Sequence, residues 1–211
     1  MRQVLQGEGF GIRLRPVRMK DAAFIVWLRN LEHAKGKLGD SATTVASQEA
    51  WLTSYFERNN DHYFIVETRA GIPVGTHSIY DIHGLNAEAG RFIIRPDVSA
   101  ALPASIVSYD LAFGPMKLTS LRATSIASNR TLHSYIKKLG FRQVKVETGG
   151  RVIGGHPVDI FHFSLDIEDW PESRERVRPL AEFASVQVAT WEQKILETES
   201  TAHEPFNRTI E

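Results

Sequence analysis

The 211-residue sequence predicts an α+β fold, in which a mixed, mostly antiparallel twisted sheet carries helices on both faces and is followed by a C-terminal helical extension. Two observations predict it. Strand-like and helix-like periods follow one another in the order strand, two helices, three strands, helix, strand, helix and one or more strands. The three middle strand-like runs are joined by connections of only a few residues, which favour an antiparallel meander.

The N-terminal part of the pattern predicts one strand and two helices. The stretch "GIRLRPV" (11–17) alternates apolar and polar residues like a strand. Asp21 begins a short helix, and a second helix starts near Ser47 after a loop over 31–44 that is rich in glycine, lysine and small polar residues. The helical period predicts that the buried faces carry Phe24, Trp27 and Leu28 in the first helix, and Ala50, Trp51, Ser54 and Tyr55 in the second.

The central part predicts the meander and two further strand–helix pairs. "HYFIVET", "VGTHSIYDI" and "NAEAGRFIIR" are the three meander strands. A helix from about Pro103 to Phe113 follows, because proline is tolerated in a first helical turn. After the strand "LTSLRATSIA", Asn129 opens a helix that Gly140 ends, and "HPVDIFHFSLDI" is the last strand. The apolar stripe of that helix is Leu132, Tyr135, Ile136 and Leu139.

The pattern changes after Trp170, which suggests a domain over residues 1–167 and a helical extension with its tail over 168–211. An apolar helical stripe runs through Val177, Leu180, Ala181, Ala184, Val188, Trp191 and Ile195. This stripe must cover either the protein's own sheet or a second subunit, and both alternatives fit the sequence.

Composition limits the classes of function. The net charge is zero, which argues against a broad nucleic-acid-binding surface. The chain has no cysteine, so disulfides and thiol catalysis are excluded, in keeping with a reducing cytoplasm. No apolar run predicts a signal peptide or a membrane span. We therefore expect a cytoplasmic protein without nucleic-acid or membrane partners.

Four segments in the right order resemble the GCN5-related N-acetyltransferase (GNAT) superfamily over roughly residues 11–167. They are "IRLRPVRMKDA", "YFIVETRAGIPVGTHSIYDI", "AEAGRFIIRPD" and "NRTLHSYIKKLGF". In outline the chain is most similar to the subgroup of amino-sugar and RimJ/RimL-like acetyltransferases. The resemblance implies a GNAT-like sheet, acetyl-CoA as co-substrate, and direct attack of a deprotonated amine on the thioester.

The resemblance also places the coenzyme at the segment after "GRFII". Relatives carry glycines in this phosphate-binding loop, and this chain has none there. Small residues and helix N-terminal N–H groups can still hold a pyrophosphate, whereas an ordinary strand-to-helix turn is the plain alternative. The implied coenzyme-binding residues are Ile93, Ile94, Arg95, Ser99, Ala100, Ala101, Leu102, Ala104, Ser105, Asn129 and Arg130.

The resemblance suggests three catalytic candidates. Glu88 occupies a strand position that often carries the base, with a solvated strand-edge carboxylate as the alternative. His77 is a second candidate base, or a hydrogen-bonded structural histidine. Tyr135 is the candidate acid, although it lies one residue from the tyrosine position of many relatives and also fits the buried stripe.

The acceptor side of the site is predicted to include Lys35, Lys37, Tyr80 and Asp81. The two lysines would meet a nucleotide diphosphate, or belong to a charged surface loop. Asp81 also fits the start of a turn. The stretch "HSIYDIH" has no recognised pattern of metal ligands, so we expect no metal.

The leading hypothesis is an N-acetyltransferase that uses acetyl-CoA to modify a primary amine of a small molecule, such as a nucleotide-linked amino sugar. The competing hypothesis is a non-catalytic module of the same fold with a degenerate coenzyme loop. An acetyltransferase of protein N-termini is a third alternative. The C-terminal apolar stripe is consistent with a homodimer, and packing within one chain explains it equally well.

Overall fold

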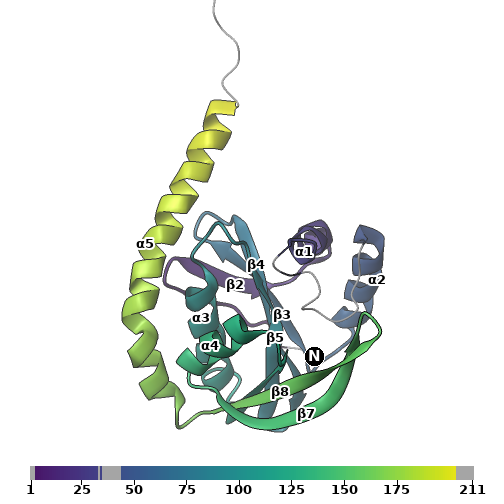
Figure 1. Cartoon of the computed structure of the whole chain (residues 1–211). Coiled ribbons are helices and arrows are strands. Elements are labelled where there is room, and N and C mark those ends of the chain that lie inside the picture. Colours follow the sequence, from purple (N-terminus) through teal and green to yellow (C-terminus); the bar gives the residue numbers. More distant parts are fainter. Residues whose placement is uncertain (1–2, 33, 35–43, 203–211) are drawn as a thin grey trace, which may run out of the picture.

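The computed structural model describes residues 3–32, 34 and 44–202, and within them an eight-stranded sheet forms the centre of the molecule (Figure 1). The strand order is β1-β2-β3-β4-β5-β6-β8-β7. The strands β5 and β6 pair in parallel, and every other neighbouring pair is antiparallel. The bounds are β1 Gly7–Gly9, β2 Ile12–Pro16, β3 His62–Thr68, β4 Pro73–His83, β5 Asn86–Ile94, β6 Ser120–Ile126, β7 Arg142–Ile153 and β8 His156–Asp166.

Helices cover both faces of this sheet, so the predicted fold class is confirmed. In Figure 1, α1 and α2 lie on one face, and α3, α4 and the long α5 lie on the other. None of these described helices has the length and apolarity needed to cross a bilayer. The helices are η1 Met19–Asp21, α1 Ala22–Arg29, α2 Val45–Phe56, α3 Ala101–Phe113, α4 Arg130–Lys138 and α5 Trp170–Ala202.

The strand β3 is buried along its whole length because it contributes to a core on each face. Phe64 and Val66 belong to the larger core, together with residues of α3, α4 and α5. Tyr63 and Ile65 point the other way and pack against α1 and α2. The period-two alternation of β3 therefore separates a face that carries α3 from a face that carries α1 and α2.

The buried faces of the two N-terminal helices differ from the expected ones. In α1, Ile25 and Leu28 are buried, whereas Trp27 is 45% exposed. Trp27 instead stacks on Phe24 and lies 5.3 Å from the Arg95 guanidinium, so its ring covers a side chain at the surface.

In α2, the buried residues are Gln48, Leu52 and Tyr55. Tyr55 and Trp51 of the predicted stripe do face the core, whereas Ala50 and Ser54 are exposed, so the stripe was half right. The tyrosine sets this orientation, because its hydroxyl accepts a hydrogen bond from the Tyr63 N–H at 2.9 Å.

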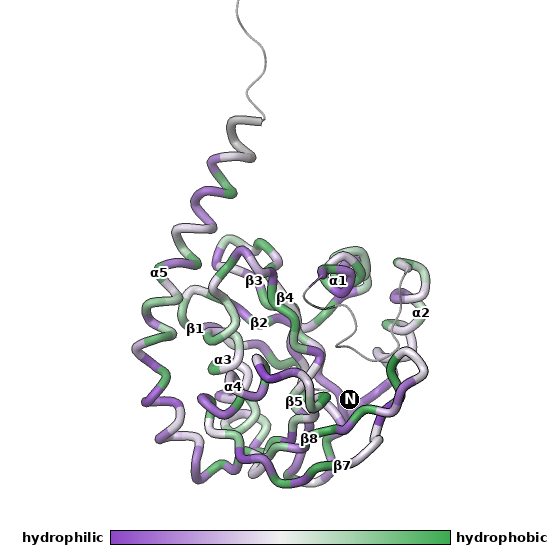
Figure 2. The backbone as a smooth tube through the Cα atoms, viewed as in Figure 1, coloured by the Kyte–Doolittle hydropathy of each residue, from purple (hydrophilic) through white to green (hydrophobic). Residues whose placement is uncertain are grey.

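The extension beyond Trp170 packs against α3 at its start. Val177, Ala181 and Val188 belong to the same core as α3, whereas Leu180 of the predicted stripe is 57% exposed. Farther along, α5 projects beyond the body of the molecule (Figure 1). Figure 2 shows hydrophobic and hydrophilic residues alternating along α5, as expected for a helix with one covered face.

Candidate active site

The parallel strands β5 and β6 pair over only three residues and then part. Their ladder runs from Asn86 opposite Ser120 to Glu88 opposite Arg122. Both strands continue beyond that point, β5 to Ile94 and β6 to Ile126. The chain enters α3 after β5 and α4 after β6, so the parted ends lie beside two helix N-termini.

A β-bulge in β5 directs side chains to the two faces of the sheet at this point. Ser78 is opposite Gly90 and Thr76 is opposite Ile93, so two residues of β5 face one residue of β4. Arg91 has φ +48°, and its side chain lies on the α1/α2 face. Phe92 contacts His77 and Tyr135 on the α3 face.

Glu88 connects the parting strands from the α1/α2 face. Its Oε1 accepts hydrogen bonds from the Tyr80 hydroxyl of β4 at 2.7 Å and from the Thr124 hydroxyl of β6 at 3.0 Å. Burial raises the pKa of Tyr80, and the Glu88 carboxylate raises it further, so this phenol stays a donor. The structure thus brings together two predicted site residues, Glu88 and Tyr80.

His77 lies on the opposite face and is only 1% exposed. Its Nδ1 is 2.8 Å from the Ser108 hydroxyl of α3, and its ring meets the edges of Phe92 and Tyr109. Burial lowers the pKa of His77 to about 3, so the imidazole is neutral at physiological pH. These contacts hold β4 against α3, so they favour a structural role for His77 over a role as the base.

Tyr135 ties α4 to the first turn of α3. Its hydroxyl donates to the Ala101 carbonyl oxygen at 2.9 Å and lies 2.7 Å from the Ser105 hydroxyl. Its ring stacks on Phe92 at 6.0 Å. Burial raises the pKa of Tyr135, which keeps the phenol protonated. Ser105 is buried and uses its hydroxyl in this contact rather than at the protein surface.

The N-terminus of α3 has the properties of an anion-binding site. Ala100 precedes the helix and provides no side-chain cap. The N–H groups of Ala101 and Leu102 lack acceptors within the helix because they belong to its first turn, and Pro103 has no N–H. The helix begins two residues before the predicted start. Ser99 is exposed beside these donors, so the residues present fit a pyrophosphate group.

Other predicted coenzyme residues are engaged in the fold. Ile93 is buried beside Leu28 of α1, whereas Ile94 packs against the core of the α3 face. The Ala104 N–H donates to the Ala100 carbonyl as a normal helical bond.

Arg95 lies between two tryptophans. Its guanidinium is 5.3 Å from the ring of Trp27 and 4.8 Å from that of Trp191, and it pairs with Asp97 at 2.8 Å. Its side chain therefore links α1 to α5.

The start of α4 is capped by its own asparagine. Asn129 accepts a hydrogen bond from the Leu132 N–H at 3.3 Å, as expected for an N-cap, and Arg130 beside it is exposed. Asp81 is also exposed and accepts hydrogen bonds from His83 at 2.8 Å and Arg122 at 3.4 Å. Lys35 and Lys37 fall outside the described residues. Over the described ranges, no three His, Asp or Glu side chains are grouped to hold a metal ion.

Sequence reasoning missed three polar residues on the α1/α2 face, namely Arg29, Arg91 and Thr124. Arg91 lies inside the motif "AEAGRFII", but without the bulge its side chain would be assigned to the other face. Arg29 ends α1, where a basic residue is ordinary, so its position gave no signal.

The sheet is mostly antiparallel, with one short parallel pair that parts beside a helix N-terminus. Residues 12–142, more than half of the chain, match the model of the acetyltransferase (GNAT) domain, and this arrangement is the one found in that fold. The chain belongs to this family. The search of the curated proteins found no match.

Solved structures agree with this fold at low sequence identity. RimJ from Mycobacterium smegmatis, in complex with CoA-disulfide, is 21% identical with a TM-score of 0.73, covering 86% of this chain and 98% of that one. FdhC, a nucleotide-linked sugar GNAT, is 21% identical with a TM-score of 0.68, covering 87% and 99%. Spermidine N-acetyltransferase from Vibrio cholerae, in complex with CoA and spermine, is 16% identical with a TM-score of 0.67, covering 77% and 99%.

Proposed function

We propose that the protein transfers an acetyl group from acetyl-CoA to a primary amine of a small molecule. One observation carries this proposal: β5 and β6 part immediately after Glu88, and an uncapped helix N-terminus follows β5. The parted strands give a thioester arm a route beside a carboxylate, and the helix N-terminus offers N–H donors to the coenzyme phosphates. The RimJ and spermidine acetyltransferase structures, which contain coenzyme, support acetyl-CoA as co-substrate.

Starting from the acceptor ammonium, the nitrogen loses two protons, one before it attacks the thioester and one as the amide forms, and the departing sulfur takes up one proton. Glu88, directly or through water, takes the proton from the acceptor ammonium, because most primary amines are protonated at neutral pH. The amine nitrogen then bonds to the thioester carbonyl carbon, and the carbon–sulfur bond breaks. Tyr80 and Thr124 fix the Glu88 carboxylate through its Oε1.

Tyr135 is the candidate proton donor for the departing sulfur. Its phenol stays protonated because burial raises its pKa, and its hydroxyl lies at the start of α3, where the coenzyme is proposed to bind. The same hydroxyl orders the first turn of α3, so Tyr135 also has a positioning role.

The acceptor is proposed to be a small amine, with a nucleotide-linked amino sugar as the specific case. FdhC, a nucleotide-linked sugar GNAT, supports this case, because the structural match covers 99% of the FdhC chain. Since acetyl-CoA is the donor, the proposed reaction takes place in the cytoplasm.

The substitution Ala101→Asp tests the coenzyme site. A carboxylate at the first position of α3 is expected to stabilise the helix by about 0.3–1 kcal/mol while repelling the coenzyme pyrophosphate. Calorimetric titration with acetyl-CoA should show micromolar binding to the wild type, worth about 8 kcal/mol, and affinity reduced by about tenfold or more in the variant.

The matched control is Ala46→Asp, which adds the same charge to the exposed first turn of α2 and should leave coenzyme affinity unchanged. No binding of acetyl-CoA to the wild type would contradict the proposal and favour the non-catalytic module.

A homodimer through α5 remains part of the proposal. Several large apolar side chains are exposed on this helix: Leu180, Phe183, Val186 and Leu196. Burying such side chains between two copies would stabilise an assembly. Light scattering after size exclusion should therefore give twice the chain mass, and replacing Leu180 and Phe183 by glutamate should halve it. A monomeric mass for the full chain would reject the dimer.

A further inference from the structure

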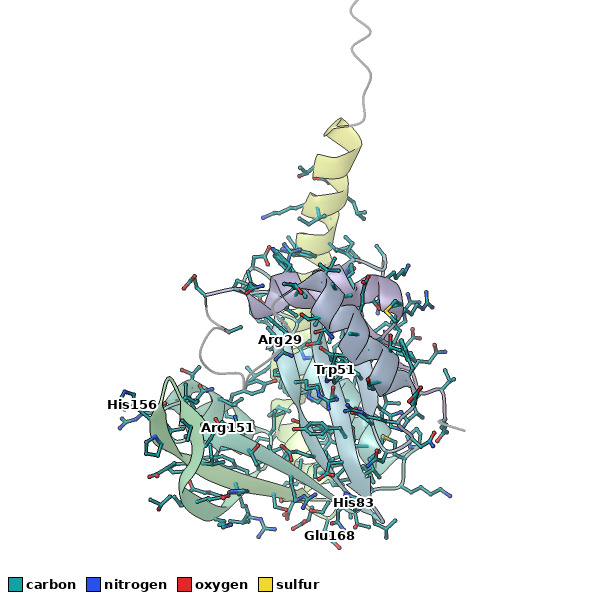
Figure 3. All side chains as sticks on the ribbon, turned by 90° about the vertical axis from the view of Figure 1, so that its right-hand side faces the viewer. Arg29, Trp51, His83, Arg151, His156 and Glu168 are labelled. Atoms are coloured by element: carbon teal, nitrogen blue, oxygen red, sulfur yellow. The ribbon has the colours of Figure 1, made fainter. Side chains whose placement is uncertain are left out.

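Arg29 is a half-buried cation with one buried donor that has no described partner. It is the last residue of α1, and Figure 3 shows its side chain where α1 approaches the sheet. Within the part of the chain that the structure describes, its Nε is buried and has no hydrogen-bond partner. A buried charged donor left unsatisfied is costly, so such groups in native proteins commonly serve a ligand.

A second guanidinium lies on the same face. Arg91, at the β5 bulge, stands 4.3 Å from the ring centre of Tyr80 and 5.1 Å from that of Trp51. Its Nη1 pairs with Asp61 at 2.7 Å. Burial lowers the pKa of Arg29, and the charge of Arg91 acts in the same direction.

Tyr80 connects Arg91 to the proposed base. Its hydroxyl donates to Glu88, while its ring face supports Arg91. The carboxylate that would deprotonate an amine and the Arg91 guanidinium therefore lie about one aromatic side chain apart, on the face of the sheet that α1 and Arg29 cover.

We propose that the acceptor is an amine that also carries a carboxylate or phosphate group, and that Arg29 binds this anion. That this amine is the acceptor rests on the proposed acetyl transfer, whereas binding of its anion to Arg29 needs no coenzyme. Arginine suits this role because its fork of N–H donors matches carboxylate and phosphate oxygens. The same two positive charges disfavour polyamines, which lack an anionic group.

Thermal unfolding without acetyl-CoA tests the proposal with probes that differ only in the anion. Phosphoethanolamine is compared with ethanolamine, and glycine with glycinamide. At least one anionic probe should raise the Tm of the wild type in a concentration-dependent way, while its neutral counterpart does not. The pair that responds tells whether a phosphate or a carboxylate is the preferred anion.

The variant Arg29→Met should bind that anionic probe about tenfold to a hundredfold more weakly. Its unliganded Tm should equal or exceed that of the wild type, because the substitution removes a buried donor that has no described partner. Arg58→Met is the matched control, since Arg58 is an arginine on the same face, over the ring of Trp51, whose side chain is 42% exposed. This control should bind the probe like the wild type.

Two results would overturn the proposal. One is that the anionic and the neutral probes raise the Tm of the wild type equally, or that no probe raises it. The other is an Arg29→Met protein that is folded and binds the anionic probe as tightly as the wild type. Failure of the proposed function would look different, because acetyl-CoA would then not bind while the anionic probe still stabilised the protein.

Discussion

Replacing Glu88 by glutamine is expected to reduce turnover by about a hundredfold to ten-thousandfold, the usual contribution of a positioned general base. The amide keeps the shape of the side chain and can still accept a hydrogen bond from Tyr80, so the fold should be retained. The measurement is steady-state kinetics with an acceptor amine at saturating acetyl-CoA, together with calorimetric titration of acetyl-CoA.

The coenzyme affinity separates a catalytic effect from a structural one. Glu88 faces α1 and α2, whereas the proposed phosphate site lies at the start of α3, so Glu88→Gln should bind acetyl-CoA like the wild type. A pH profile adds a second readout, because the loss should be smallest at high pH, where the free amine needs no base. Unchanged turnover at neutral pH would reject Glu88 as the base.

Thr124→Val provides a matched control. It removes one of the two hydrogen bonds to Glu88 but leaves the carboxylate in place. We expect a smaller fall in turnover than for Glu88→Gln. An equal fall in both variants would indicate that the bridge between β4 and β6 matters more than proton transfer.

Most of the sheet and its helices were predictable from the sequence because they follow from local patterns, whereas the strands β1 and β7 were not assigned. The apolar run of β3 and the apolar stripe of α4 both predict the observed elements. The buried faces of α1 and α2 were harder to predict. Which side of a short helix is buried depends on its neighbours, as the exposed Trp27 and the buried Leu52 show.

The candidate site was only partly predictable, for a related reason. Glu88 and Tyr80 emerged from the resemblance and the strand pattern, and the structure joins them. Arg91 did not, because a bulge shifts the side-chain alternation by one residue. Gly90, a glycine inside the strand pattern, is the local signal that could have suggested the bulge. Arg29 required knowledge of how α1 packs on the sheet. The residues that the sequence missed are those whose positions depend on tertiary packing.

The substitution Trp170→Ala is expected to lower the free energy of unfolding by about 3–5 kcal/mol. Trp170 begins α5 and is 4% exposed. Its ring lies 5.4 Å from Tyr109 and 6.2 Å from Phe113, both in α3. Its indole N–H donates to Asp110 at 2.9 Å, so truncation leaves a cavity and removes a hydrogen bond. Urea unfolding at neutral pH is the measurement.

This loss would be a large part of the stability of an ordinary domain, about 5–15 kcal/mol in total. Trp170→Phe should lower the free energy of unfolding by less, because it keeps most of the ring packing and removes only the N–H donor. This variant replaces the alanine variant in the measurement if the latter does not fold. Phe56→Ala, at a 40% exposed position at the end of α2, is the control and should cost less than about 1 kcal/mol.

The size of the loss decides how the C-terminal extension relates to the rest of the chain. Trp170, Val177 and Val188 share one core with α3, so a disturbed Trp170 should lower the stability of the whole molecule in a single transition. A loss below about 1 kcal/mol, or a separate early transition of α5, would mean that the extension docks weakly on an independent domain. A single cooperative transition would mean that α5 supports α3, and through α3 the helix N-terminus that the coenzyme is proposed to use.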